Sequence, residues 1–216
     1  MNDRDTVLAR VRRALANDSS APVIDPARAY RQTSNEDLDE RVAQFVQRVS
    51  EYHASAQVVT PESLTSAIAS ACLRRSVRSL VVPDDVPPEW WPERVQIEPD
   101  SRLEPLPNER LDNSDGVLTG CALGIAQTGT IVLDGGVCQG RRVITLLPDY
   151  HLCVIREEQI VGLVPEALRI LQTTHPESPR PFTFVSGPSA TSDIELNRIE
   201  GVHGPRTLEV LVVTGS

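Results

Sequence analysis

Short apolar runs that alternate with helical patterns limit this chain to a fold built on a β-sheet. A run from Gln57 to Val59 precedes a helical pattern that begins at Thr60-Pro61, and a second run follows from Leu80 to Val82. Proline is favoured at the first position of a helix, which supports this start. A strand, a helix and a strand in this order form a right-handed crossover between parallel strands. We therefore predict an α/β protein with a mostly parallel sheet.

The other apolar residues follow the same two periodicities, those of a helix and of a strand. Helices are expected over residues 3–16, from an N-cap at Ser34 to about His53, and from about Pro165 to Leu171. Further strands are expected at Val117 to Cys121, Thr130 to Leu133, Val143 to Leu147, Leu152 to Ile155, Phe182 to Val185 and Leu208 to Val213.

A proline-rich segment interrupts this pattern between Pro83 and Pro107. Its seven prolines exclude a regular helix or a central strand, because proline lacks the backbone N–H that both require. Trp90-Trp91 lies in the middle of the segment and is expected to cover the edge of the core. A surface for a partner protein is the alternative.

The polar residues 17–33, with Pro22 and Pro26, are typical of a linker. The predicted organisation is an N-terminal helix and linker over residues 1–33, followed by an α/β domain over residues 34–216. The first helix packs either on its own domain or on a partner or neighbouring subunit, and the sequence leaves both open.

Composition excludes several classes of function. A net charge of −9 argues against nonspecific nucleic-acid binding, and no apolar run approaches the roughly 20 residues that span a bilayer. The N-terminus lacks the apolar core of a signal peptide, so a cytoplasmic location is expected. All 21 basic residues are arginine, which excludes Schiff-base catalysis, a pyridoxal phosphate anchor and a Walker A loop. A bound anion would therefore be held by arginine, hydroxyl groups or backbone amides.

The four cysteines are scattered, without a C-x-x-C pair. Free, buried thiols in a reducing compartment are expected. A zinc or iron–sulfur site could be assembled only from Cys121, Cys138, Cys153 and His151, whose spacing matches no usual ligand pattern. No metal site is predicted.

Glycine points to where a site would be built, because all twelve glycines follow Asp115. Phe182 to Val185 is expected to be a buried strand, and the turn Ser186-Gly187-Pro188-Ser189 leads from it to Ser192-x-x-Glu195, the spacing of a helix capping box. A strand, a small-residue turn and a helix start offer backbone N–H groups to an anion. An ordinary strand-to-helix turn is the alternative.

Two further motifs lie between expected strands. Gln127-Thr128-Gly129-Thr130 offers an amide, two hydroxyls and a glycine, and Gln139-Gly140-Arg141-Arg142 places two arginines before the expected strand at Val143. Neighbouring residues of a strand point to opposite faces, so one arginine at most should face a pocket. The alternative is a solvated strand entrance with one buried ion pair.

Two histidines are candidates for proton transfer. Asp149 could orient His151 as a general base, although a turn with a hydrogen-bonded histidine is the commoner arrangement. His203 lies between Gly201 and Gly204, which would let a ligand approach closely, so it is the better candidate.

These motifs resemble the lactate utilization protein C family. The residues that carry the resemblance are Thr119-Gly120-Cys121, Gln127 to Leu133, Gln139 to Arg142, Leu146 to His151, Ser186 to Glu195 and Gly201 to Pro205. It extends over the LUD domain, roughly Leu38 to Val213, and implies a three-layer α/β/α fold like that of the glucosamine-phosphate deaminase, ribose-phosphate isomerase and coenzyme A transferase group. It also implies a role beside an iron–sulfur subunit and a second partner in oxidising L-lactate to pyruvate, with the clusters on the partner and no cofactor bound here.

One residue departs from the family pattern. The family usually has Glu-Thr-Gly-Thr where this chain has Gln127, and a glutamine cannot act as an acyl-accepting nucleophile or a general base. A side chain that only hydrogen-bonds a ligand or the opposite loop can be glutamine, which is the interpretation we favour.

The sequence therefore predicts a non-redox accessory subunit of an L-lactate oxidation complex with a pocket for a small anion. The predicted ligand-binding residues are Gln127, Thr128, Gly129, Thr130, Gln139, Gly140, Arg141, Arg142, Gly187, Pro188, Ser189, Thr191, Ser192, Asp193, Glu195 and His203, and the candidates for catalysis are Asp193 and His203. One alternative is a stand-alone enzyme that acts on a phosphorylated or coenzyme A-linked metabolite through Asp134, Asp193 or Glu195. Another is a scaffold that contacts partner subunits through its first helix or the Trp90-Trp91 loop.

Overall fold

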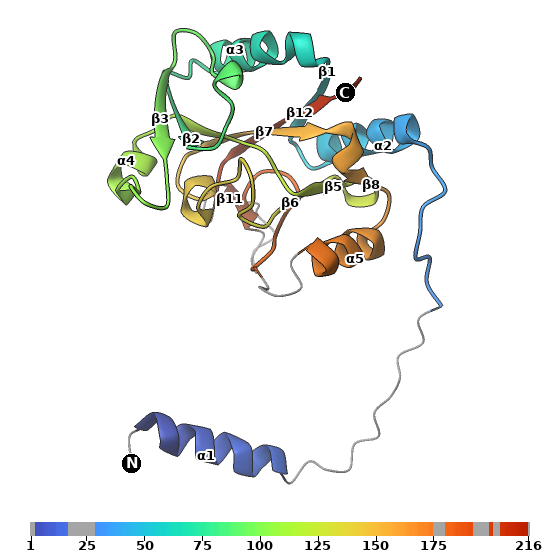
Figure 1. Ribbon diagram of the computed structural model, residues 1–216, viewed down its shortest axis with the longest axis vertical. Helices are drawn as coiled ribbons and strands as arrows, with labels where there is room; N and C mark the ends of the chain where they lie inside the picture. The colour runs from blue at the N-terminus through green and yellow to red at the C-terminus, as the bar shows by residue number, and fades with distance from the viewer. Residues whose placement is uncertain (1–2, 17–28, 175–179, 192–198, 201–203, 216) are drawn as a thin grey trace. The chain divides into compact units, whose positions relative to one another are not determined.

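The computed structural model of the protein describes residues 3–16, 29–174, 180–191, 199–200 and 204–215 (Figure 1). The chain divides into two compact units, with the boundary between Arg31 and Gln32. The first contains the expected helix, α1 (Asp3–Ala16), none of whose residues is buried. None of the described helices is both long and apolar enough to cross a membrane.

A six-stranded parallel sheet forms the centre of the second unit, which confirms the predicted α/β class. Its strand order is β1 (Ser55–Val59), β12 (Thr207–Val213), β7 (Tyr150–Arg156), β4 (Gly116–Thr119), β2 (Ser79–Pro83) and β3 (Gln96–Asp100). The central strands read as almost continuous apolar runs because both of their faces are covered. β3, inside the proline-rich segment, is an edge strand, where proline is tolerated.

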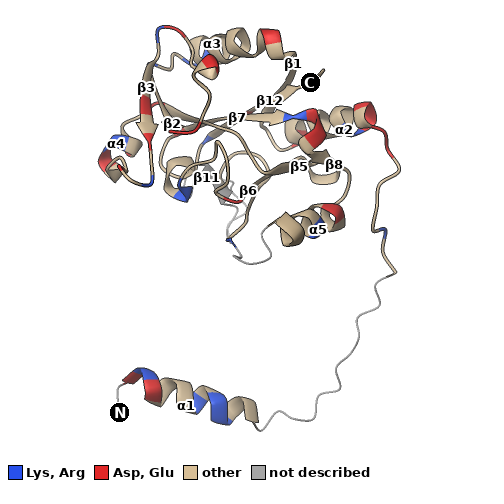
Figure 2. Cartoon of the chain, viewed as in Figure 1, with Lys and Arg blue, Asp and Glu red and all other residues tan. Residues whose placement is uncertain are grey.

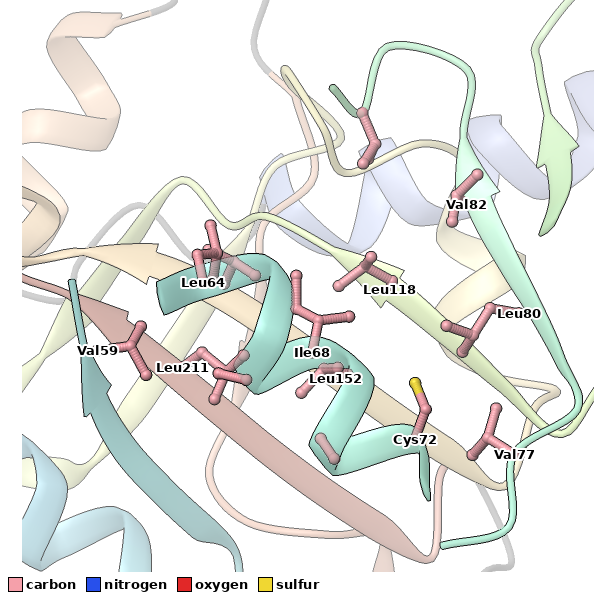
Figure 3. Packing of buried hydrophobic residues seen from close by; sticks show 14 of the residues in the cluster. Val59, Leu64, Ile68, Cys72, Val77, Leu80, Val82, Leu118, Leu152 and Leu211 are labelled. Atoms are coloured by element: carbon pink, nitrogen blue, oxygen red, sulfur yellow. The ribbon is translucent and has the colours of Figure 1, made fainter. Parts of the chain in front are cut away.

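Helix α3 (Leu64–Arg74) covers one face of this sheet, after the short 3-10 helix η1 (Pro61–Ser63). Figure 3 shows Ile68 and Cys72 of α3 over Leu80, Leu118 and Leu152 of three neighbouring strands. Trp90 and Trp91, at the end of η2 (Pro88–Trp90), pack at the edge of this cluster, so the prediction that they cover the core is confirmed.

The opposite face is covered by helices and by a second, smaller sheet. The helices are α2 (Leu38–Glu51) and α4 (Asn108–Asp112), and the sheet has the order β8 (Ile160–Val161), β5 (Leu123–Ile125), β6 (Thr130–Leu133) and β9 (Thr183–Val185). Helix α5 (Val164–Thr174) packs against β5 and β6 of this small sheet. The short 3-10 helices η3 (Ala126–Thr128) and η5 (Glu157–Gln159) lie beside it, and β10 (Ala190–Thr191) pairs with β11 (Ile199–Glu200).

Two expected strands are corrected by the structure. The run from Val143 to Leu147 is not a strand, and its Ile144 packs into a buried cluster with Val81, Leu111 and Val117. The chain instead forms the 3-10 helix η4 (Arg142–Thr145). The run from Phe182 to Val185 does form a strand, β9. Among the described strands it pairs with β6 alone, and its Phe184 is 45% exposed, so the strand is not buried.

The start of α2 also differs from the expectation. Asp37, not Ser34, is the N-cap: its Oδ1 accepts from the Glu40 N–H at 2.9 Å, and the Glu40 carboxylate accepts from the Asp37 N–H at 3.2 Å. This reciprocal capping box satisfies two N–H groups that a serine three residues earlier cannot reach.

Candidate functional site

Two adjoining hollows form a cleft beside η4 and β9. The outer hollow has a volume of about 570 Å³ and the inner hollow about 220 Å³. Both are lined by Arg142, Thr145 and Thr183, so the two adjoin at these residues. The first residues of β7 and β12 contribute His151 and Leu208 to the inner hollow.

Four arginines line the outer hollow: Arg102, Arg141, Arg142 and Arg180. Arg141 is neutralised, because its Nε lies 2.9 Å from Oδ2 of the fully buried Asp100 and its Nη2 bonds Oδ1. This is the single buried ion pair that the sequence left as an alternative for the two adjacent arginines. Asp100 in turn raises the pKa of the Arg141 guanidinium, mainly through this hydrogen bond.

The other three arginines have no ion pair with a carboxylate in the described part of the chain. Arg102 donates to the Gly135 carbonyl at 3.0 Å, and Arg142 donates through Nη1 to the Thr145 hydroxyl at 2.6 Å. Burial lowers the pKa of Arg142, although an arginine stays charged at any physiological pH. Acidic and basic residues are interspersed over the rest of this unit (Figure 2), so the excess of positive charge in the cleft is local.

A buried loop supports the floor of the outer hollow. Gln139 accepts from the Asp134 N–H at 2.8 Å and donates to the Asp134 carboxylate at 2.7 Å. The same carboxylate accepts from the Gly136 N–H at 2.8 Å. Gln139 is therefore a structural residue of the cleft, which holds the loop that leads to Arg141 and Arg142.

His151 forms part of the inner hollow and is almost fully buried. Its Nε2 lies 2.8 Å from Oγ1 of Thr119, on the neighbouring strand β4. Asp149 is exposed and lies 3.6 Å from Arg206, so it does not orient the imidazole. Burial, and then the positive charge of Arg142, lowers the pKa of His151 to about 4, so the ring is neutral at physiological pH.

Stability should therefore depend on pH through His151. Between pH 6.5 and 4 the unfolded chain binds a proton at this histidine that the folded chain does not, so stability falls as the pH falls through this range. Between pH 7 and pH 5 the loss is expected to be roughly 2 kcal/mol. Urea unfolding at both pH values measures it, with His151→Gln as the control. If the variant loses as much stability as the parent, His151 is not the responsible group.

The turn at Ser186 forms the opposite wall of the inner hollow. Gly187 has φ +77°, and a Cβ there would lie 2.5 Å from the Tyr52 carbonyl oxygen at the end of α2. Glycine is thus required by packing as well as by backbone conformation. The Ser189 N–H donates to the Pro205 carbonyl at 2.8 Å, so this amide is not available to an anion.

The Gln127-Thr128-Gly129-Thr130 turn lines neither hollow but lies behind one wall. Gly129 packs on the backbone of α2, and the Gln127 side chain is exposed. The Thr130 hydroxyl lies 2.7 Å from the hydroxyls of both Thr128 and Ser186. This turn therefore supports the cleft through Ser186.

The structure brings together two of the three predicted motifs. Residues lining the cleft are Gln139, Gly140, Arg141, Arg142, Gly187, Pro188 and Ser189. Thr191 belongs to β10. Ser192, Asp193, Glu195 and His203 lie outside the described residues, as does the expected helix start.

Sequence reasoning missed Arg102, Arg180, Thr145 and Thr183. Arg102 and Arg180 are isolated in proline-containing segments, and no periodicity or spacing connects them with the glycine motifs. The sequence connected His151 with Asp149 and with three cysteines, but not with Thr119 on a neighbouring strand, which is its partner in the structure.

The cysteines are free thiols, as expected: Cys72, Cys121 and Cys153 are buried, and Cys138 is partly exposed. Burial raises the pKa of Cys72 to about 11, with the Glu209 carboxylate as the next cause. Across the described residues, no three His, Cys, Asp or Glu side chains are placed to hold a metal ion.

Known proteins resemble this chain in sequence and in fold. The LUD domain family matches residues 106–213. A lactate utilization protein C from Deinococcus radiodurans is 46% identical over 79% of this chain and 78% of its own length, and one from Halalkalibacterium halodurans is 35% identical over 45% and 43%. A crystal structure of a DUF162 family protein from Deinococcus radiodurans superimposes with a TM-score of 0.70 at 37% identity, covering 82% of this chain and 99% of that one. The chain belongs to the LUD domain family, together with the lactate utilization protein C sequences.

Proposed function

We propose that this chain takes part in lactate utilization as a non-redox subunit of a cytoplasmic complex that oxidises L-lactate to pyruvate. In this proposal the chain binds a small organic anion in its cleft and holds no cofactor. The iron–sulfur clusters belong to one partner subunit, and a further subunit completes the complex.

The observation that carries the proposal is the set of arginines in the cleft that have no carboxylate partner among the residues that the structure describes. Arg102, Arg142 and Arg180 surround a concave volume in a chain whose net charge is −9. A guanidinium binds a carboxylate through paired, charge-assisted hydrogen bonds. The name of the relatives, lactate utilization protein C, suggests which acid is bound. Lactate and pyruvate are both carboxylates, so either could bind these arginines.

The test is lactate-dependent dye reduction by the native complex, with and without this chain. Removal of the chain should lower the rate, and adding it back should restore the rate. The Arg142→Gln variant should restore less than about a tenth of it, because a charge-assisted hydrogen bond contributes about 1.5–3 kcal/mol.

Arg169→Gln is the matched control. Arg169 is an exposed residue of α5 that lines neither hollow, so this variant should restore the rate in full. A complex whose lactate oxidation is indifferent to this chain would exclude the proposed role.

The size of the outer hollow favours a second candidate function. At about 570 Å³ the outer hollow is larger than a three-carbon acid needs, and it falls within the range of sites for larger metabolites. An enzyme that acts on a phosphorylated or coenzyme A-linked metabolite would use the same arginines. Turnover of such a substrate by the purified chain alone would favour this function over the accessory role.

A further inference from the structure

We propose that the inner hollow is a subsite for a 2-oxo or 2-hydroxy monocarboxylate, in which Arg142 binds the carboxylate and His151 donates a hydrogen bond to the oxygen on C2. The assignment rests on the proposed function, because it names the ligand class of the same cleft. It adds a specificity-determining residue, His151, and a residue that positions it, Thr119.

The hydrogen bond with Thr119 fixes the position of the ring proton. The Thr119 side chain is fully buried, and its bond with His151 Nε2 is its only hydrogen bond to the described residues. If Nε2 carried the proton, the threonine O–H would be a buried donor without an acceptor, which costs about 1–3 kcal/mol. The threonine therefore donates to Nε2, and the neutral ring carries its proton on Nδ1.

His151 lines the inner hollow, and none of the hydrogen bonds between described residues involves its other ring nitrogen, Nδ1. Its N–H is thus a donor available to a ligand.

Among the described residues that line the inner hollow, Arg142 supplies the only charged side chain. Thr145 engages its Nη1, which leaves Nε and Nη2 for a carboxylate. Arg142 and His151 both line this hollow. A single positive charge with a neutral donor beside it suits a monoanion.

The remaining features of the hollow agree with a small, polar acid. Its volume of about 220 Å³ lies below the roughly 300–1,000 Å³ of sites for drug-sized ligands. Hydroxyl groups of Thr145, Ser186 and Ser189 lie along its lining. Since the Nδ1–H donates, the oxygen on C2 must accept, which either a ketone or a hydroxyl oxygen can do.

Calorimetric titration of the purified chain with pyruvate, L-lactate and propionate tests the assignment. Propionate has the carboxylate but no oxygen on C2. Pyruvate and L-lactate should bind about fivefold more tightly than propionate, as expected for one hydrogen bond. Arg142→Gln should weaken all three acids by about tenfold or more, and Arg169→Gln should change none of them.

Substitutions of His151 and Thr119 should change the ratio of the affinities for pyruvate and propionate. His151→Leu should reduce the affinities for pyruvate and L-lactate to that for propionate, while propionate binding is retained. Thr119→Val keeps the imidazole but removes the hydrogen bond that fixes its tautomer. This variant should reduce the preference for pyruvate over propionate about twofold. A variant that merely disturbs the hollow would weaken all three acids alike, and urea unfolding confirms that each variant is folded.

Equal binding of pyruvate and propionate, or an unchanged ratio in His151→Leu, would overturn the assignment. If His151→Leu does not fold, an unchanged ratio in Thr119→Val has the same meaning. If the complex needs this chain for lactate oxidation but the chain binds pyruvate no better than propionate, the subsite assignment is wrong and the proposed role stands. If the chain prefers pyruvate to propionate but the complex oxidises lactate equally well without it, the subsite assignment stands and the proposed role is excluded.

Discussion

Gly129→Ala should lower the free energy of unfolding by about 3 kcal/mol, from two separate causes. Gly129 has φ +58°, where a side chain costs roughly 1–2 kcal/mol. A Cβ there would lie 2.5 Å from the Val49 nitrogen and 2.6 Å from the Arg48 carbonyl carbon, so α2 must shift at a further cost of roughly 1–3 kcal/mol. In a domain of this size the melting temperature should fall by roughly 6–12 °C, which calorimetry measures.

Gly135→Ala is the matched control for this substitution. Gly135 has a similar φ of +65°, but the nearest atom to its added Cβ is the flexible end of Arg102, at 3.2 Å. Only the backbone cost of roughly 1–2 kcal/mol should remain. Equal losses in the two variants would show that the close approach to α2 contributes nothing.

Asp100→Ala should lower the free energy of unfolding by a similar amount, because it leaves Arg141 without its carboxylate partner. The Asp100 carboxylate is fully buried and also accepts from the Leu106 N–H at 2.9 Å. Removing one member of a buried ion pair costs about 3–5 kcal/mol. The Arg141 side chain is 25% exposed and regains some hydration, so we expect about 3 kcal/mol. Urea unfolding gives the value directly.

The control for Asp100 is a carboxylate in an exposed pair. Glu158 bonds Arg156 with both side chains about half exposed, so Glu158→Ala should cost less than about 1 kcal/mol. A small loss in both variants would mean that the Asp100–Arg141 pair is no more stabilising than a surface pair.

The main sheet and its helices could be predicted because their signals are strong and local. In β12, Leu208, Val210 and Val212 face one layer and Leu211 and Val213 the other, and such two-sided burial produces a continuous apolar run. The helical spacing of α2 and α3 is similarly clear. Two strands of the second sheet, β5 and β8, were missed because they have only three and two residues, too few to show a period.

The cleft could be predicted only in part. Glycine and arginine motifs located Arg141, Arg142 and the Gly187 turn, because each motif is continuous in sequence. Arg102 and Arg180 reach the same hollow from segments nearly 80 residues apart, through tertiary packing that no local pattern encodes. The run after Arg142 was mistaken for a strand because a short apolar run does not distinguish a strand from a buried 3-10 helix.

The position of β12 has a consequence for how this protein folds during synthesis. β12 lies between β1 and β7, and β1 pairs with no other strand of the main sheet. A ribosome makes β1 early and β12 after all the other strands of that sheet, so β1 must wait for its neighbour until translation of this domain is nearly complete. An unpaired strand is prone to association with other chains. Slow translation between β7 and β12 should therefore prolong the period in which the nascent chain depends on chaperones.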